Sequence, residues 1–176
     1  TVTLTIGDSY GGGIVAYILH EEGETLYDEN GDELYSYDEN VQHGLIAAEA
    51  DAGSTMAWSN ITDTSVGTTG TAIGDGRANT TLIVNQIVDT IHCTSGAAYY
   101  CANLTEGGYT DWFLPSKDEL GKLYLKKETI GDFADSGYWS SSESSDTLAR
   151  FQYFNTGNQI TCSKGNLNHV RAVRAF

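Results

Sequence analysis

The sequence predicts an α+β fold, with all 176 residues in one domain. Segments with the alternation of β-strands lie at both ends of the chain, and segments with helical periodicity lie between them. The 20 glycines and the single proline are typical of a chain with many tight turns rather than of a helical bundle. No apolar run is long enough to span a membrane, and no repeat or linker divides the chain. We therefore expect one hydrophobic core, in which the N- and C-terminal strands pair.

The first third of the chain is expected to form strands joined by turns. A glycine-rich turn at Gly7–Gly13 separates the first two strands, of which the second has the more buried pattern. Residues 24–38 are expected to form an inserted hairpin, because Asn30-Gly31 is the strongest short hairpin signal. The core strands predicted here are Val2–Ile6, Ile14–Leu19 and His43–Ala48.

Helices are expected in the middle of the chain, after a Thr- and Gly-rich loop over residues 59–76. Asn79 is expected to cap the first helix. The apolar face of that helix comprises Ile83, Val84, Ile87, Val88 and Ile91. A second, short helix is expected over residues 97–103.

A capping box marks the start of the next helix. Ser116 and Glu119 have the spacing of this motif, in which each side chain bonds the backbone N–H of the other residue. The buried face of the helix is expected to comprise Leu120, Leu123 and Tyr124. After Gly131 we expect strands and turns up to the C-terminus.

The charge of the chain excludes several classes of partner. It carries 24 acidic and 9 basic residues, which gives a net charge of −15. A nucleic acid or an anionic membrane would be repelled by this field, so we expect neither as a partner and no membrane insertion. An acidic surface rich in Thr, Ser, Asn and Gly is common on exported proteins, and we expect an extracellular location.

The chain lacks the motifs of the common enzyme classes, so we expect no enzyme, no cofactor and no bound metal. It has no nucleophile elbow, no zinc-protease helix, no phosphate loop and no dinucleotide fingerprint. Its four histidines lack metal-ligand spacing. Ser140–Glu143 could hold a nucleophile, yet no base is placed by the sequence to activate it. Hydroxyl groups that bond a turn explain this segment better.

One segment has the spacing of a calcium-binding loop. Its oxygen ligands would be Asp28, Asn30, Asp32, Ser36 and Glu39. The sixth position of such a loop needs a glycine for its sharp turn, and this chain has Glu33 there. The hairpin explains the segment without a metal, so calcium is the weaker interpretation.

The three cysteines allow one disulfide. Cys93 and Cys101 flank a Thr-Ser-Gly turn, and a disulfide could close this loop in an oxidising compartment. The alternative is two buried free thiols, and we expect the disulfide. Cys162 has no partner and no zinc-site spacing around it.

Five ordered blocks of sequence together resemble a known family. The blocks are Tyr10–Val15, Gln42–Ala48, Gly107–Leu120, Gly137–Glu143 and Val170–Phe176. In this order they resemble the family named after the C-terminal domain of a bacterial collagen-like adhesin. The likeness extends from about Gly7 to the C-terminus.

The resemblance implies a C-type-lectin-like fold, with two main helices beside mixed, mostly antiparallel sheets. Members of the family occur on bacterial surface proteins and on phage or viral particles, where they bind glycans or protein receptors. The resemblance therefore implies a non-enzymatic ligand-binding domain, displayed on a cell surface or a particle. In this fold the last third of the chain forms the binding face, and a homo-oligomer is compatible with that role.

A narrower resemblance concerns residues 144–169. This region is similar to the variable region of proteins that retroelements diversify, in which adenines of the coding repeat are randomised. An ordinary hairpin of a fixed adhesin is the alternative interpretation. The binding residues that the resemblance implies are Asp146, Thr147, Leu148, Arg150, Phe151, Tyr153, Thr156, Asn158, Ile160, Thr161, Ser163, Asn166, Leu167, Asn168 and His169.

Four of these residues are expected to anchor a ligand: Arg150, Phe151, Tyr153 and Asn158. Aromatic and arginine side chains dominate the energy of interfaces. Strand alternation places Arg150 on one side of its strand and Phe151 with Tyr153 on the other, and either side could face the core.

Four further residues are expected to be structural. Trp112 and Trp139 lie in the blocks that resemble the family framework, and we expect both in the core. Arg171 and Arg174 are expected to pair with carboxylates of this acidic chain.

Two other functions are alternatives to a displayed ligand-binding domain with a diversified surface. A fixed adhesin could bind a sulfated or acidic glycan, as the best-known relatives do. The charge weighs against a polyanionic ligand unless Arg150, Lys164, Arg171 and Arg174 cluster. An enzyme of unfamiliar type would require a buried pair of titratable groups in a pocket.

Overall fold

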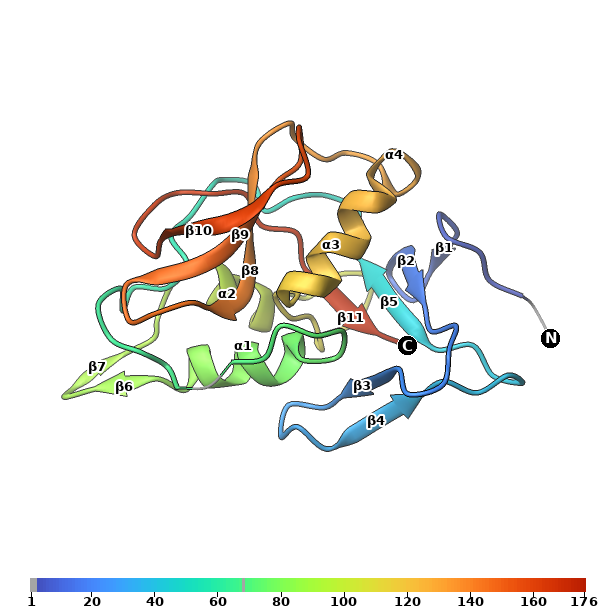
Figure 1. The fold of residues 1–176 in the computed structure, drawn as a ribbon, viewed down its shortest axis with the longest axis horizontal. Helices are drawn as coiled ribbons and strands as arrows, with labels where there is room; N and C mark the ends of the chain where they lie inside the picture. The colour runs from blue at the N-terminus through green and yellow to red at the C-terminus, as the bar shows by residue number, and fades with distance from the viewer. Residues whose placement is uncertain (1–2, 68) are drawn as a thin grey trace.

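The computed structural model describes residues 3–67 and 69–176, and it has the mixed α+β architecture expected from the sequence (Figure 1). Two antiparallel sheets form its centre, and two separate hairpins extend from it. The first sheet has the strand order β1 (Ser9–Tyr10), β2 (Gly13–Ile18), β5 (Gly44–Ala47) and β11 (Val173–Ala175). The second has the order β10 (Gln159–Ser163), β9 (Leu148–Tyr153) and β8 (Gly137–Glu143).

The remaining elements surround these sheets. The hairpins are β3 (Thr25–Tyr27) with β4 (Glu33–Ser36), and β6 (Ile87–Val88) with β7 (Ile91–His92). The helices are α1 (Gly76–Val84), α2 (Ala97–Ala102), α3 (Lys117–Leu125) and α4 (Lys127–Ile130). None of these helices is long and apolar enough to cross a membrane. The helix α3 joins the two sheets, since it packs on β2 of the first and on β8 and β9 of the second (Figure 1).

The first sheet forms because two strongly apolar strands pair. All four residues of β5 are buried, and so are four of the six residues of β2. The strands approach so closely that a Cβ atom at Gly44 would lie 2.0 Å from the carbonyl oxygen of Tyr17. These strands confirm the two core strands expected over residues 14–19 and 43–48, with each bound shifted by one residue.

The expected pairing of the terminal strands is wrong. β11 pairs with β5, and β5 pairs on its other side with β2, so β5 separates the two ends of the chain. The strand expected over Val2–Ile6 is not formed at residues 3–6, and Val2 lies outside the described residues. Instead, the side-chain amide of Gln42 bonds both backbone groups of Leu4, at 2.7 Å to its N–H and 3.0 Å to its carbonyl. One side chain thereby satisfies this backbone without a strand partner.

The inserted hairpin expected over residues 24–38 is confirmed. β3 and β4 flank Asn30 and Gly31, and Gly31 has a φ of 83°, which glycine adopts without strain. The carboxylate of Asp28 accepts hydrogen bonds from the backbone N–H groups of Asn30 and Asp32, at 2.8 Å and 3.0 Å. The turn is therefore fixed by its own residues.

The first helix differs from the one expected. α1 begins at Gly76 and ends at Val84, and Asn79 is buried inside it rather than at its N-cap. The Asn79 amide bonds the N–H and the carbonyl of Gly70, both at 2.8 Å, so it holds the preceding loop. Ile87, Val88 and Ile91, which were expected on the helix face, form β6 and β7. Their spacing fits a helix or a hairpin, and a turn through Asp89, with a φ of 55°, decides for the hairpin.

The two later helices were anticipated. The short helix expected over residues 97–103 is α2, and the capping box opens α3. The backbone N–H of Glu119 donates to the Ser116 hydroxyl at 3.3 Å, and that of Ser116 donates to the Glu119 carboxylate at 2.7 Å. Leu120 and Leu123 are buried as expected, and Tyr124 is partly buried beside them. The four-residue helix α4 was not predicted.

The two C-terminal arginines are structural, as expected. Arg171 is fully buried, and its Nε donates to Asp51 at 2.7 Å while another guanidinium N–H donates to the carbonyl of Asp132 at 2.6 Å. Arg174 holds Asp111 with two hydrogen bonds, at 2.7 Å and 2.9 Å. Both side chains therefore tie the C-terminal segment of the chain to loops far away in the sequence.

The expected core tryptophans are buried too. Trp139 is inaccessible to solvent and Trp112 is 2% exposed. The indole N–H of Trp139 donates to the carbonyl of Met56 at 2.9 Å, so its polar atom is satisfied. Two clusters of buried apolar side chains result, and Trp139 belongs to the one that lies under the second sheet.

Candidate functional site

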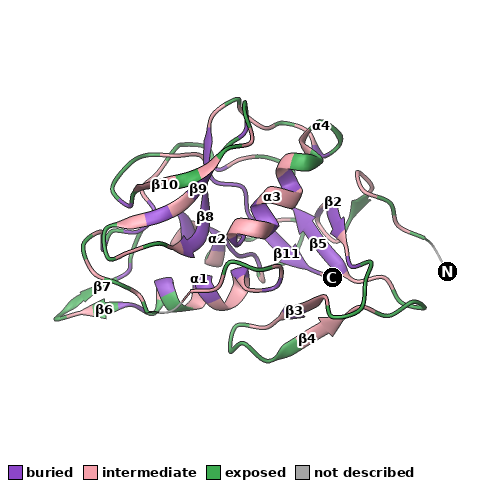
Figure 2. Cartoon of the chain, viewed as in Figure 1, coloured by how far each residue is buried: buried purple, intermediate pink, exposed green. Residues whose placement is uncertain are grey.

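Burial falls across the second sheet from β8 to β10 (Figure 2). Six of the seven residues of β8 are buried, compared with three of six in β9 and none of five in β10. The register between β9 and β10 is unbroken from Gln152 opposite Gln159 to Leu148 opposite Ser163. The β9–β10 hairpin is therefore a regular, exposed element that rests on a buried strand.

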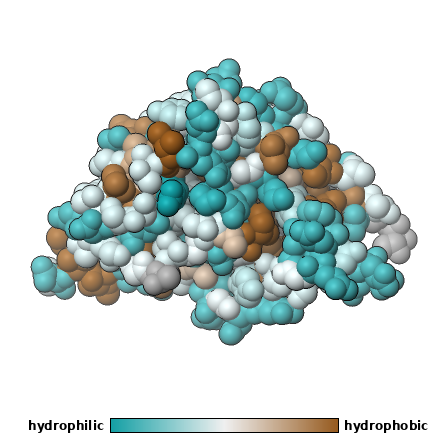
Figure 3. Space-filling model, viewed as in Figure 1, coloured by the Kyte–Doolittle hydropathy of each residue, from teal (hydrophilic) through white to brown (hydrophobic). Residues whose placement is uncertain are grey.

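One side of this hairpin is aromatic and apolar. We call it the aromatic face, and it consists of Ala149, Phe151, Tyr153, Ile160 and Cys162. The rings of Phe151 and Tyr153 meet edge to face with their centroids 4.8 Å apart. Tyr153 is 39% exposed and Ile160 is 45% exposed. Apolar side chains are visible over β9 and β10 among hydrophilic neighbours in Figure 3.

The other side of the hairpin is polar and borders α3. We call it the helix face, and it consists of Leu148, Arg150, Gln152, Gln159, Thr161 and Ser163. The amide of Gln159 donates to the Gln152 side chain at 3.2 Å and to the carbonyl of Lys117 at 2.7 Å. These bonds join the hairpin to the first turn of α3.

The structure brings most of the predicted binding residues to the surface, but on two faces and the adjoining loops. Arg150 and Thr161 lie on the helix face, while Tyr153 and Ile160 lie on the aromatic face. Leu148 and Asn168 are partly buried. The exposed residues in the loops and at the strand end are Asp146, Thr147, Thr156, Asn158, Ser163, Asn166 and Leu167.

Two of the predicted binding residues are placed differently from the expectation. Phe151 was expected to anchor a ligand, but it is only 4% exposed and packs against Trp139 with the ring centroids 6.0 Å apart. It points over the buried strand β8, so it closes the core instead. His169 is partly buried, because its ring lies beside Tyr138 and its Nδ1 is 3.6 Å from the Asp51 carboxylate.

A buried ion pair fixes the loops that flank the hairpin. Lys164 is fully buried, and its Nζ lies 2.6 Å from the Glu143 carboxylate. The same ammonium donates to the carbonyls of Asp146, at 2.6 Å, and of Thr64, at 3.0 Å. It also lies 4.9 Å from the centre of the Trp58 ring. The exposed residues on both sides of Lys164 are thereby held on a rigid frame.

The expected disulfide is not formed. Cys93 and Cys101 are both buried as free thiols, which was the alternative interpretation. The Cys93 sulfur contacts the Ser59 hydroxyl at 3.7 Å, whereas Cys101 lies within α2 in the core. Burial raises the pKa of both thiols, so both are poor nucleophiles. Cys162 is partly exposed on the aromatic face, where the Asn166 amide lies 3.0 Å from its sulfur.

The basic residues named for a polyanion site do not cluster. Lys164, Arg171 and Arg174 are each committed to a carboxylate in the framework. Arg150 is different, because its side chain has no hydrogen bond or ion pair with any residue in the described ranges. The nitrogen Nε of Arg150 is buried without a partner there.

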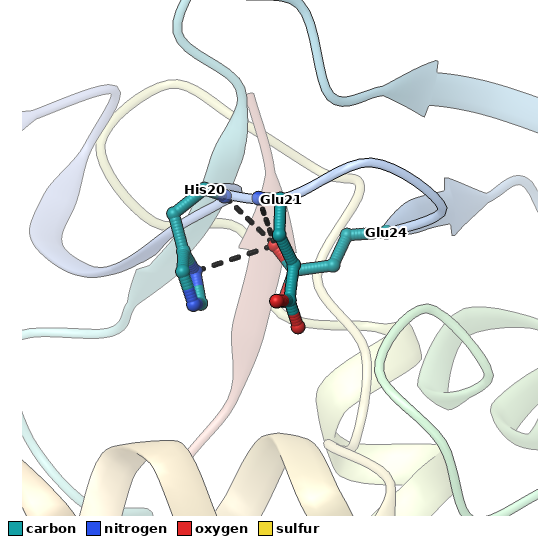
Figure 4. Close-up of side chains that lie close together, drawn as sticks. All are labelled: His20, Glu21 and Glu24. Atoms are coloured by element: carbon teal, nitrogen blue, oxygen red, sulfur yellow. Dashed lines mark hydrogen bonds and ion pairs between the residues drawn. The ribbon is translucent and has the colours of Figure 1, made fainter.

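A group of metal-ligand residues lies on the loop after β2 (Figure 4). Ligand atoms of His20, Glu21 and Glu24 lie within 4.8 Å of one another. The Glu24 carboxylate already accepts hydrogen bonds from the backbone N–H groups of His20, at 2.7 Å, and Glu21, at 3.3 Å, and from the Tyr17 hydroxyl. Burial raises the pKa of Glu24, but these hydrogen bonds outweigh it and lower the pKa. The three side chains lie together because Glu24 holds the backbone of the loop.

The residues of the calcium-like spacing do not gather in this way. Among the described residues, the group of three His, Cys, Asp or Glu side chains whose ligand atoms come together is the one on the loop after β2, and it contains none of Asp28, Asp32 and Glu39. Ser36 lies in β4, where its hydroxyl bonds Glu33. Asp28 bonds the turn of the hairpin. The geometry therefore supports the hairpin interpretation.

Among the residues that the structure describes, Glu119 is the fully buried carboxyl group whose pKa is strongly raised. Burial raises its pKa to about 7, although backbone N–H groups of Ser116 and Gly74 donate to it. It fixes the loop before α1 to the start of α3. It does not line the cavity of about 560 Å³ beside α3, and the nearby charge of Asp75 adds to the rise in its pKa.

Gln159 is a partly exposed residue that was not among the predicted binding residues. It lines a cavity of about 560 Å³ between the hairpin, α3 and the loop after β2. Gly121, Tyr124 and Asp118 line the same cavity. Its position between Asn158 and Ile160 in an alternating strand was the available signal, because alternation places it beside Thr161.

Comparison with known proteins assigns most of the chain to a family. The family model described as "Lcl C-terminal domain" matches residues 44–174 of the chain. These residues include β5, all but the last residue of β11, and the whole of the second sheet. No curated protein matches the chain.

Proposed function

The chain belongs to the Lcl C-terminal domain family, and on that premise we propose that it is a non-enzymatic ligand-binding domain for display on a cell surface or a particle. We propose a C-type-lectin-like fold for it, as the family resemblance implies. Its binding surface is the β9–β10 hairpin with the flanking loops, within residues 144–169. The ligand is a receptor on another cell or particle.

The observation that carries this proposal is the exposure of chemically mixed side chains on a rigid frame. Tyr153, Ile160 and Leu167 are large apolar residues that are 39%, 45% and 66% exposed. Asn158 and Asn166 supply adaptable polar groups close to them. A mixture of aromatic anchors and short polar side chains is what paratopes use, and the buried frame lowers the entropy cost of binding.

The charges favour a protein receptor over a sulfated glycan. A polyanion needs several free cations on one surface, and Lys164, Arg171 and Arg174 are occupied by carboxylates. The net charge of −15 opposes a polyanion as well. An exposed apolar set such as Ile160 and Leu167 is suited to a protein surface.

Diversification by a retroelement is part of the proposal. Most of the predicted binding residues are exposed, while the residues between them, such as Phe154 and Lys164, are buried. Substitution at the exposed positions would therefore leave the core intact. Sequencing the coding locus tests this: a nearby template repeat that differs from codons 144–169 only at adenines supports it, and the absence of a template points to a fixed adhesin.

The binding function is tested with arrays of immobilised proteins and glycans. We expect the chain to bind a defined set of proteins, and Ile160→Asp and Leu167→Asp to abolish those signals. The matched controls are Ile87→Asp and Ile91→Asp on the β6–β7 hairpin, since Ile87 and Ile91 are 58% and 57% exposed. Signals lost equally in both pairs would contradict the assignment of the surface, and signals confined to sulfated glycans would favour the fixed-adhesin alternative.

A further inference from the structure

The outer edge of β10 carries backbone groups without partners. The hairpin pairs Tyr153 with Asn158 through a hydrogen bond of 2.9 Å, and Lys164 bonds the carbonyl of Thr147 at 3.0 Å through its backbone N–H. In an antiparallel ladder the residues between such pairs point their N–H and C=O groups away from the partner strand. Gln159 and Thr161 therefore direct theirs outward, and neither has a backbone partner among the described residues.

This edge also lacks the features that normally block strand addition. Natural edge strands are protected by charges, prolines, bulges or short length. β10 is five residues long, has the sequence QITCS without charge or proline, and keeps an unbroken register with β9. At the edges of the first sheet, by contrast, β1 has only two residues and β11 is buried throughout.

A free arginine stands next to this edge. Of the four arginines, Arg77, Arg171 and Arg174 each lie within 2.8 Å of a carboxylate oxygen. Arg150 has no such partner among the described residues, although its Nε is buried. It lies directly opposite Thr161 on the helix face, so only a short side chain separates it from the open edge.

We propose that the β10 edge binds an extended segment of a protein receptor as an added strand, and that an acidic side chain of that segment pairs with Arg150. This inference rests on the proposed function and names its binding mode. The backbone of Gln159 and Thr161 offers two N–H and two C=O groups, which an extended segment would satisfy. A side chain beside Thr161 would start about 10 Å from Arg150, a span that an arginine and a glutamate bridge together.

The acidic chain does not prevent this pairing. Charges more than about 8 Å away are largely screened at physiological ionic strength, whereas Arg150 would meet the carboxylate in direct contact. A carboxylate at that point would supply acceptors to the guanidinium that no described residue bonds. On the other side of the added strand, apolar side chains would lie beside Ile160 on the aromatic face.

The test is a titration of the chain with the peptide acetyl-Thr-Val-Glu-Val-Thr-amide. Binding is monitored by NMR, through the signals of the backbone amides and of the arginine Nε–H groups. We expect saturable shifts at Gln159, Thr161 and the Arg150 Nε–H, with the Nε–H signals of Arg171 and Arg174 unchanged. The Gln-for-Glu peptide should bind at least tenfold more weakly. Thr161→Pro removes an outward N–H and no β9 bond, so it should abolish binding, while Thr161→Val keeps the N–H and should preserve it.

Several outcomes would overturn the proposal. They are an absence of saturable shifts, equal binding to Thr161→Pro and Thr161→Val, and equal binding of the Glu and Gln peptides. Concentration-dependent dimers that Thr161→Pro dissolves would assign the edge to a second copy of this chain instead. If Thr161→Pro does not fold, a peptide with alternate backbone nitrogens methylated takes its place, and undiminished binding of that peptide contradicts strand addition.

Failure here can be told apart from failure of the proposed function. Array signals that are lost in Ile160→Asp and Leu167→Asp but kept in Thr161→Pro would overturn strand addition and leave the binding surface standing. Peptide binding at the edge, without any array signal that depends on Ile160 and Leu167, would overturn the proposed binding surface and leave strand addition standing.

Discussion

The strands β5 and β10 are similar in length and both belong to antiparallel sheets, yet their surroundings are opposite. Every residue of β5 is buried, and strands pair with it on both sides. None of the residues of β10 is buried, and only β9 pairs with it. The difference shows how the chain separates two tasks, because β5 holds the ends of the fold together while β10 presents side chains to solvent.

The framework keeps its position through polar contacts as well as through the core. Arg171, Arg174 and Lys164 are each paired with a carboxylate that lies far away in the sequence or in a separate loop. A buried ion pair is weak evidence for stability as such, but the loss of one partner leaves an uncompensated charge. Substitutions in the framework should therefore lower the free energy of unfolding strongly, and substitutions on the surface of β10 should change it little.

The largest expected effect comes from breaking the frame beneath the hairpin. Lys164→Ala leaves the 5% exposed Glu143 carboxylate without its ion-pair partner, so we expect a loss of about 3–5 kcal/mol in the free energy of unfolding. Urea denaturation measures it. Lys126→Ala, at an exposed lysine, is the control and should change stability by less than about 0.5 kcal/mol. A loss below about 1 kcal/mol for Lys164→Ala would show that the ion pair does not hold the frame.

The next effect depends on pH. The pKa of Glu119 is about 7 in the folded chain, above its ordinary value near 4.5, so the folded state keeps a proton that the unfolded state loses. The stabilisation is complete below pH 4.5 and is lost as the pH rises to about 7, by at most about 3 kcal/mol. We expect Glu119→Gln to lack this slope. Parallel pH profiles of stability for the two proteins would contradict the assignment.

A smaller effect separates two glycines of the two regions. Gly44→Ala would place a Cβ atom 2.0 Å from the Tyr17 carbonyl oxygen, so the pairing of β2 and β5 must shift, at a cost of about 1–3 kcal/mol. Gly165→Ala, in the loop after β10, meets only the Ser163 hydroxyl at 3.9 Å. It should leave stability unchanged. Thermal unfolding distinguishes them, and equal melting temperatures for the two variants would remove the contrast between the regions.

The smallest effect is expected at the binding surface itself. Ile160→Asp and Leu167→Asp replace side chains that are 45% and 66% exposed, so each should alter the free energy of unfolding by no more than about 0.5 kcal/mol. Circular dichroism during urea unfolding measures the change. A loss of more than about 2 kcal/mol in either variant would show that this surface serves the fold rather than a ligand.

Local signals in the sequence predicted many of the elements. The hairpin at Asn30-Gly31, the apolar strands β2 and β5 and the capping box at Ser116 each depend on neighbouring residues, and the structure contains all three. The bounds of α1 were harder to predict, because the spacing of Ile87, Val88 and Ile91 fits both a helix and a hairpin. There the hydrogen bonds of Asn79 to the loop before the helix and the turn at Asp89 decided where the helix begins and ends.

The candidate surface was predicted only in part. The region 144–169 was located from the family resemblance, and its loop residues are exposed as expected. Phe151 was wrong as a ligand anchor, because the alternation of a strand does not say which side the rest of the chain covers. The disulfide was wrong for a related reason, since the separation of two cysteines in sequence does not fix the direction of their side chains.

The sequence by itself determined the α+β class and the turns, because each follows from residue types within a short window. The family resemblance, rather than a local pattern, located residues 144–169. Only the tertiary structure decided that β5 lies between the terminal strands, that Lys164 pairs with Glu143 and that Arg150 has no carboxylate partner among the described residues. These features depend on contacts between residues that are tens of residues apart. Packing chooses among such contacts, and no local pattern encodes that choice.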